Sequence, residues 1–149
     1  MAAVVDQIEM LLTESIGMFS FIEEKEWTFK PAPEKWSKKE ILGHLIDSAQ
    51  NNLRRFIVSQ HEPDDKIYYH QDEWVRCQNY QSADIGELQQ LWLLINKQLV
   101  RTVRNIPASA LKNTCNTGKE AIELHSLEFL IEDYHAHMFH HLKQITGRH

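Results

Sequence analysis

Apolar residues recur at helical spacing in four stretches of the chain. These stretches run from about Ala3 to Lys25, from Ser37 to about Ser59, from Asp84 to Pro107 and from Ser126 to Gly147. Each has apolar positions three or four residues apart, which is typical of an amphipathic helix with one buried face. The pattern therefore predicts four helices of about 20 residues each.

The boundaries of these helices carry recognisable signals. Pro31 and Pro33 break the chain after the first stretch, because proline fixes φ and removes a backbone donor. Ser37 and Glu40 have the spacing of a capping box at the start of the second helix. Pro107 ends the third helix, and Gly147 is a natural stop for the last one.

The connections differ greatly in length. No period holds from His61 to Ser82, and a connection this long without a period is usually functional. Asn113 to Gly118 has the composition of a turn, and Glu120 to His125 alternates weakly like an extended segment. We expect an all-α four-helix bundle, one domain over residues 1–149, with a long connection between its second and third helices.

Composition supports an ordinary globular domain and excludes several classes of protein. The 149 residues are 42% hydrophobic and 25% charged, which argues against disorder, and the net charge of −5 argues against nucleic-acid binding. Cys77 and Cys115 are too few and too far apart for a disulfide framework. The sequence shows neither a signal peptide nor a run of about 20 apolar residues, so we expect a cytoplasmic protein without membrane contact.

Histidine is the unusual feature of the composition, with nine residues and a concentration near the C-terminus. Of the four histidines at 135, 137, 140 and 141, only His137 and His141 are four apart, which places them on one helical face beside the apolar stripe. Two imidazoles at this spacing can bind one metal ion, although an inward histidine is more often a hydrogen-bonded core residue. His135 points away from the core, and with His149 we expect it to serve solubility.

A third ligand must come from another helix, and His44 is the best candidate. Ser48, Asn51 and Arg55 share its angular sector on the second predicted helix, directly beside an apolar sector. That apolar sector contains Ile41, Leu45, Ala49 and Phe56. A polar stripe beside a core face is explained either as the wall of a site or as a partly exposed helix boundary.

Two other catalytic arrangements fail on spacing, and a third lacks its supporting motif. A zincin needs H-E-x-x-H, whereas Met138, Phe139 and His140 separate the two histidines. A di-iron bundle needs two E-x-x-H motifs, and only the one ending at His135 is present. A serine triad has no G-x-S-x-G motif to support it.

Four segments resemble the DinB-like (YfiT-type) family. They are 30–37, 40–48, 69–75 and 137–145, with the sequences KPAPEKWS, EILGHLIDS, YHQDEWV and HMFHHLKQI. The resemblance implies an up-down-down-up four-helix bundle, often dimeric, with zinc or nickel on a three-histidine site. Carried over position by position, the ligands are His44, His137 and His141. The family includes metal-dependent transferases and isomerases that use thiols such as bacillithiol or mycothiol.

Three neutral imidazoles leave at least one metal coordination position open, as in a catalytic site. Water there has its pKa lowered toward ~7 and a thiol is bound as the thiolate, so either becomes a nucleophile. We therefore expect a metal-dependent enzyme for a small molecule, first a thiol S-transferase and next a hydrolase. The alternatives are a non-enzymatic metal- or ligand-binding bundle and a structural bundle with an incidental histidine cluster.

Further residues are assigned to this site by angle and by loop position. Asp47 and Asp133 are candidates to orient the ligand histidines, or else simple solvated charges. The candidates for substrate contact are Asn51, Arg55, Tyr69 and Trp74. Among them, Arg55 suits an anionic group. The expected partners are a small-molecule substrate and a second copy of the chain.

Overall fold

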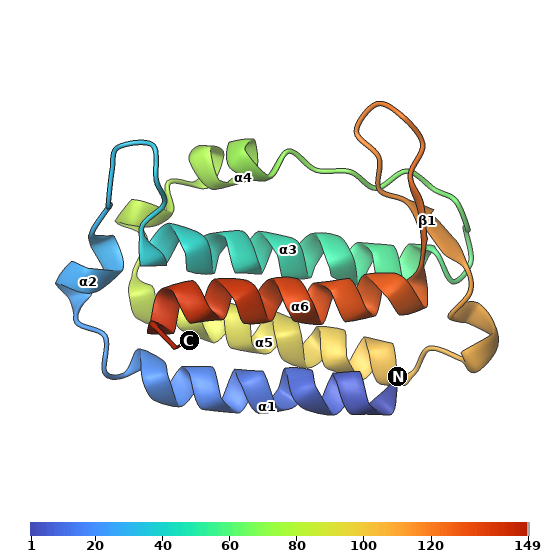
Figure 1. The fold of residues 1–149 in the computed structure, drawn as a ribbon, viewed down its shortest axis with the longest axis horizontal. Helices are drawn as coiled ribbons and strands as arrows, with labels where there is room; N and C mark the ends of the chain where they lie inside the picture. The colour runs from blue at the N-terminus through green and yellow to red at the C-terminus, as the bar shows by residue number, and fades with distance from the viewer. Residues whose placement is uncertain (149) are drawn as a thin grey trace.

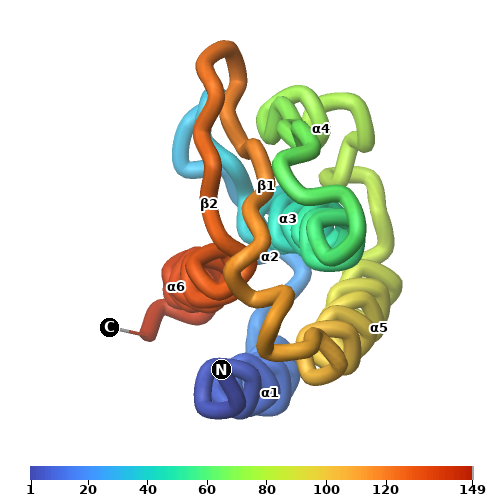
Figure 2. Tube along the Cα trace, turned by 90° about the vertical axis from the view of Figure 1, so that its right-hand side faces the viewer, coloured from blue at the N-terminus to red at the C-terminus, as the bar shows by residue number. Residues whose placement is uncertain are grey.

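A computed structural model describes residues 1–148 and shows four long helices packed side by side (Figure 1). They are α1 (Ala2–Phe19), α3 (Lys38–Val58), α5 (Ile85–Arg104) and α6 (Leu127–Thr146). Seen end-on in Figure 2, they form a square in which α3 and α1 each contact both α5 and α6. The predicted all-α four-helix bundle is confirmed.

The helices follow an up-down-down-up order, because α3 and α5 run in the same direction (Figure 1). The chain must therefore return along the bundle between them, and this explains the long connection. The return carries two helical pieces, α4 (Gln71–Gln78) and the 3-10 helix η1 (Tyr80–Ser82). The prediction that this connection has no regular structure is wrong there. In α4 only Val75 is buried, so two helical turns leave no apolar period in the sequence.

The first helix is shorter than predicted. It ends at Phe19 instead of Lys25, and a separate short helix, α2 (Glu24–Thr28), follows a turn. The turn lets Trp27 fold back onto Phe19, with the ring centroids 5.3 Å apart. Ile22 continues the apolar period by spacing alone, which is why the sequence pattern overran the end of the helix.

Side-chain caps are present at the starts of α3, α5 and α6, and the one at α3 is the predicted capping box. The Ser37 Oγ accepts a hydrogen bond from the Glu40 backbone N–H at 3.1 Å, and Glu40 accepts one from the Ser37 N–H at 2.8 Å. The side chains of Asp84 and Ser126 cap α5 and α6 in the same manner. Gly147 ends α6 in the left-handed conformation at φ 71°.

A small hairpin joins α5 to α6, after the 3-10 helix η2 (Ala108–Ala110). Its antiparallel strands are β1 (Thr114–Asn116) and β2 (Leu124–Ser126), so the predicted turn over 113–118 is wrong at β1. Asn116 also accepts a hydrogen bond from the Ile67 N–H at 2.9 Å, which ties the hairpin to the chain that leaves α3. This contact places the hairpin over the α3–α6 side of the bundle (Figure 2).

Most of the buried polar side chains lie on α3, with Ser15 of α1 and Asn96 of α5 as buried polar residues on other helices. Fully buried side chains from α1, α5 and α6 are mostly aliphatic or aromatic, whereas α3 also buries polar ones. These are Lys39, His44, Asp47, Ser48, Asn51 and Asn52. None of the helices in residues 1–148 combines the length and hydropathy needed to cross a bilayer.

Candidate metal centre

Three histidines from two helices converge beside α3. His44 of α3 and His137 and His141 of α6, here called the histidine cluster, each offer one nitrogen, and these nitrogens all lie within 4.8 Å of one another. The His44 and His137 Nε2 atoms form a hydrogen bond at 3.0 Å. The sequence had predicted this trio, and the fold brings its members together.

The local sequence explains the convergence. The capping box at Ser37 fixes where α3 begins, and therefore where His44 faces. His137 and His141 lie on successive turns of α6, with ring centroids 4.6 Å apart. The ring of Trp36 lies 4.9 Å from that of His44, which is only 1% exposed. The first histidine of the cluster is thus held by packing.

The histidine cluster is neutral at physiological pH. Burial, reinforced by repulsion from His137 and His141, lowers the pKa of His44 to about 3. Burial, reinforced by His141 and His140, lowers the pKa of His137 to about 4. Burial also lowers the pKa of His141. A metal ion binds neutral imidazole, so these histidines are in the required state without losing protons.

Gln144 orients one histidine of the cluster. Its Oε1 accepts a hydrogen bond from the His141 Nδ1 at 2.7 Å, which leaves Nε2 of that ring as the ligand atom. Sequence reasoning missed this role, although the signal was available: Gln144 follows His141 by three residues, one helical turn. The Nδ1 of His44, by contrast, is buried without a partner in residues 1–148.

The donor set fits a divalent metal ion. A tetrahedral ion with metal–nitrogen bonds near 2.0–2.1 Å holds its ligand nitrogens roughly 3.3 Å apart. The 3.0 Å between the His44 and His137 Nε2 atoms is close to that separation. Within residues 1–148 the metal group contains these three imidazoles and no fourth protein ligand, which leaves a coordination position for a substrate or water.

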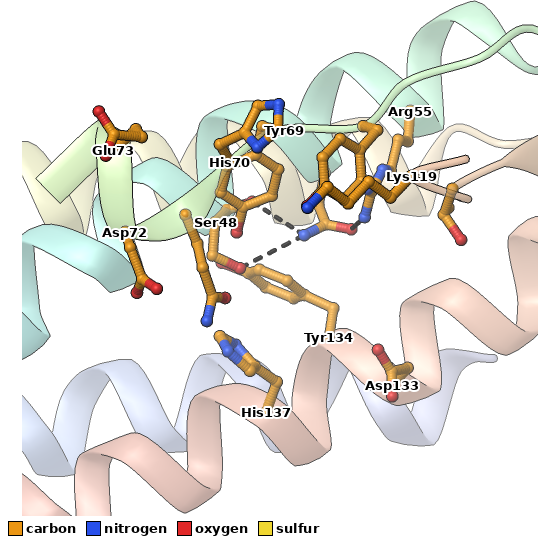
Figure 3. A pocket seen from close by; sticks show the side chains of 14 residues that line it. Ser48, Arg55, Tyr69, His70, Asp72, Glu73, Lys119, Asp133, Tyr134 and His137 are labelled. Atoms are coloured by element: carbon orange, nitrogen blue, oxygen red, sulfur yellow. Dashed lines mark hydrogen bonds between the residues drawn. The ribbon is translucent and has the colours of Figure 1, made fainter.

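Two cavities reach the histidine cluster from different sides. The polar cavity, of about 610 Å³, lies between α3, residues 68–73, the hairpin and α6, and it includes His137 (Figure 3). The second cavity, of about 760 Å³, includes His141 and is here called the apolar cavity after its walls of Phe29, Trp36 and Ile41. Charged side chains also line it, namely Glu26, Glu34, Lys35 and Lys38. Gln71 and Asp72, at the start of α4, line both. A reacting group at the cluster is therefore reachable from two chemically different spaces.

Comparison with known families agrees with this geometry. The model of the DinB superfamily matches residues 7–145. The chain belongs to the DinB superfamily. YfiT from Bacillus subtilis has the same fold, with a TM-score of 0.88 at 19% identity over 98% of this chain and 83% of that one. YfiT is described as "a probable metal-dependent hydrolase with an unusual four-helix bundle topology". No curated protein matches the sequence significantly.

The predicted substrate contacts of this DinB-superfamily chain divide into two pairs. Arg55 and Tyr69 both line the polar cavity, and the Arg55 guanidinium lies 5.9 Å from the Tyr69 ring centroid. Asn51 and Trp74 do not line it. The Asn51 Nδ2 donates to the backbone oxygen of Asp47 at 2.9 Å, and the Trp74 ring packs against Tyr69 from α4.

The two carboxylates that were predicted to orient the histidines, Asp47 and Asp133, have other contacts in the structure. Asp47 is fully buried, and its Oδ1 accepts hydrogen bonds from the Tyr80 hydroxyl at 2.6 Å and the Gln78 Nε2 at 2.8 Å. Burial raises the pKa of Asp47. Asp133 is exposed and lines the polar cavity. Neither carboxylate hydrogen-bonds a histidine of the cluster in residues 1–148, so Gln144 supplies the orienting contact that the structure contains.

The remaining C-terminal histidines lie outside the cluster. His135 is half-buried and burial lowers its pKa, so it is less exposed than expected of a solubilising residue. His140 is exposed, with its ring 5.1 Å from that of His141. His149 lies outside the described residues.

Proposed function

We propose that the chain is a metal-dependent hydrolase of a small molecule, with zinc or nickel bound by His44, His137 and His141. The observation that carries the proposal is the position of three neutral, converging histidines where two cavities meet. The likeness to the YfiT fold supports it. Such an ion, when bound, activates water and polarises the bond to be cleaved.

The side chains of the chain have distinct tasks in this proposal. The histidine cluster holds the ion and leaves a position open, and Gln144 keeps the His141 ring oriented. The polar cavity binds the hydrophilic part of the substrate, and the apolar cavity binds the other part against Phe29 and Trp36. Trp36 also shields the buried His44 from solvent.

Thiol S-transfer is the second candidate, and the pair of cavities favours it. A transfer reaction needs two substrates that meet at one ion, and here two spaces reach the cluster with different linings. A low-molecular-weight thiol of the bacillithiol or mycothiol type suits the polar cavity, and an apolar electrophile suits the other. A metal ion held by the histidine cluster would lower the pKa of the thiol, which would then bind as its thiolate.

Metal analysis of untagged protein tests the shared basis of both candidates. Wild type should contain one divalent ion per chain, and His44→Ala and His141→Ala should lose it. His135→Ala, a histidine of the same helix outside the cluster, is the matched control and should retain the ion. A wild-type protein without stoichiometric metal would rule out both enzyme proposals.

Activity assays then separate the candidates. Turnover of esters or amides without added thiol, abolished by chelation and by His141→Ala, supports the hydrolase. Turnover of electrophiles only when a thiol is added supports the transferase. Stoichiometric metal with no turnover in either assay would favour a non-enzymatic metal- or ligand-binding bundle.

A further inference from the structure

Arg55 is a cation in the polar cavity with hydrogen-bonding capacity to spare. Its Nε and Nη2 donate to the backbone oxygen of Ile67 at 3.1 and 2.8 Å, and its Nη1 donates to the Asn52 Oδ1 at 3.4 Å. A guanidinium has five N–H groups, so these three contacts leave two. The side chain is therefore fixed in place while part of its donor surface stays available.

No carboxylate in residues 1–148 forms an ion pair with Arg55. The charge of Asp133 acts on Arg55 through space, without forming a salt bridge with it. Burial lowers the pKa of Arg55, which reflects the cost of holding a charge away from water. A partly buried cation without a counter-ion is stabilised by an anionic ligand.

The polar cavity has cationic groups on one side and the histidine cluster on another. Arg55 and Lys119 both line the cavity, and in the view of Figure 3 they lie on the side opposite His137. Asp72, Glu73 and Asp133 line the same cavity. Three carboxylates disfavour a phosphate or polyanion, whereas the planar guanidinium suits a single carboxylate.

The spacing along α3 sets the shape of the ligand. His44 and Arg55 are eleven residues apart, which places their Cα atoms roughly 16 Å apart along the helix axis. Side chains on a helix lean toward its N-terminus, so the Arg55 side chain shortens this gap. A ligand that reaches both the cluster and the guanidinium must still be elongated.

We propose that the polar cavity binds an elongated small molecule with one carboxylate, which Arg55 holds while the reactive group lies at the histidine cluster. The proposal deepens the proposed function and rests on it for the position of the reactive group. Lys119 adds attraction at the cavity mouth, since it is exposed. The substrate class is thus a monocarboxylate whose cleaved or transferred group lies several bonds from the acid.

The first test uses wild-type protein loaded with zinc. Suberate monohydroxamate carries a metal-binding group at one end and a carboxylate at the other, and its methyl ester is neutral. Isothermal titration should show the acid binding roughly tenfold to a hundredfold tighter than the ester. Adipate monohydroxamate should bind tighter than the shorter succinate compound. Equal affinity for suberate monohydroxamate and its ester would overturn the proposal, as would no measurable binding of either.

Two neighbouring arginines provide matched variants. Arg55→Gln should remove the preference for the acid over the ester, whereas Arg54→Gln, at an exposed position of the same helix, should keep it. Lys119→Gln should weaken acid binding by a few-fold, and only at low salt. Arg55→Lys retains the charge and should keep part of the preference if Arg55→Gln unfolds. A preference that survives in folded Arg55→Gln contradicts the proposal.

A metal-free measurement separates this proposal from the metal centre. In nitrogen-15 NMR spectra of the metal-free protein, the Arg55 Nε–H signal is identified by its loss in Arg55→Gln. Titration with monomethyl suberate, which carries one carboxylate, should shift that signal, and suberate dimethyl ester should not. If the Arg55 signal shifts but the protein binds no zinc, the metal centre is rejected and the carboxylate site stands. If the protein binds zinc but shows neither the shift nor a preference for the acid over the ester, the carboxylate site alone is rejected.

Discussion

Two clusters of three rings lie in this bundle, and they differ in chemistry rather than in geometry. The aromatic cluster joins Phe19 to Trp27 and Trp92, with ring centroids 5.3 and 5.5 Å apart. In the histidine cluster the centroids are 4.6 to 5.0 Å apart. The aromatic rings come from three helices and the imidazoles from two, so each cluster joins separate parts of the bundle.

The difference lies in what burial does for each cluster. The aromatic rings bury large apolar surfaces, and this stabilises the fold. Within residues 1–148, an orphaned buried nitrogen occurs in both clusters, at the His44 Nδ1 and at the Trp92 Nε1, so it does not distinguish them. The imidazoles also turn ligand nitrogens toward one another, with the Nε2 atoms of His44 and His137 3.0 Å apart. Gathering polar atoms in this way costs stability unless a ligand such as a metal ion satisfies them. We infer that the aromatic cluster serves the fold and the histidine cluster serves a function.

The largest expected change in stability comes from a substitution in the aromatic cluster. Trp92→Ala removes a side chain that is 0% exposed and should lower the free energy of unfolding by about 3–5 kcal/mol. Chemical denaturation measures this loss. Leu94→Ala, on the same helix but 62% exposed, is the control and should change stability by less than about 0.5 kcal/mol. If Trp92→Ala also abolished metal binding while folded, the two clusters would not be independent.

Two glycines extend the comparison to the backbone. A Cβ at Gly43, next to His44, would collide with the Tyr80 ring, whereas one at Gly17 of α1 would meet nothing within 4 Å. Gly43→Ala should therefore destabilise by about 1–3 kcal/mol, because Tyr80 is packed against α3. Gly17→Ala should stabilise by about 0.5–1 kcal/mol, since alanine favours the helix. Thermal unfolding distinguishes them, and equal effects would contradict the tight packing at Gly43.

These residues also show how far sequence could predict the molecule. The four long helices and the trio of histidines followed from period and spacing, because a helical face is fixed by residue number. The approach of Tyr80 to Gly43 and the placement of α4 depend on contacts between distant segments, which no local pattern records. The sequence placed Arg55 on the same face of its helix as His44. Its hydrogen bonds to the Ile67 backbone could not be predicted, because Ile67 lies beyond the helix and its position depends on the fold.

A smaller effect is expected from the residue that orients the histidine cluster. Gln144→Ala removes the acceptor for the His141 Nδ1 and should weaken metal binding by about 10- to 100-fold. Competition with a chelator dye measures the affinity. Gln98→Ala, on the exposed surface of α5, is the matched control and should leave affinity unchanged. An unchanged affinity in Gln144→Ala would show that helix packing alone orients the ring.

The smallest expected effect is a loss of stability at mildly acidic pH, which the histidine cluster causes and the aromatic cluster does not. In metal-free protein the folded pKa values of about 3 for His44 and about 4 for His137 lie below the ordinary 6.5 of the unfolded chain. The unfolded state therefore takes up more protons as pH falls below 6.5, and stability falls with it until the folded histidines also titrate. Between pH 7 and pH 6 the loss should be about 1 kcal/mol, measured by urea denaturation.

His44→Leu isolates the histidine contribution to that slope. Leucine fills a similar volume without a nitrogen to satisfy, so the variant should be as stable as metal-free wild type at pH 7 or more stable. It should also lose less stability between pH 7 and pH 6, because one of the depressed histidines is gone. A steep slope that persists in His44→Leu would place the pH dependence elsewhere. A strongly destabilised variant at pH 7 would show that His44, like Trp92, holds the fold together, and the functional distinction between the clusters would fail.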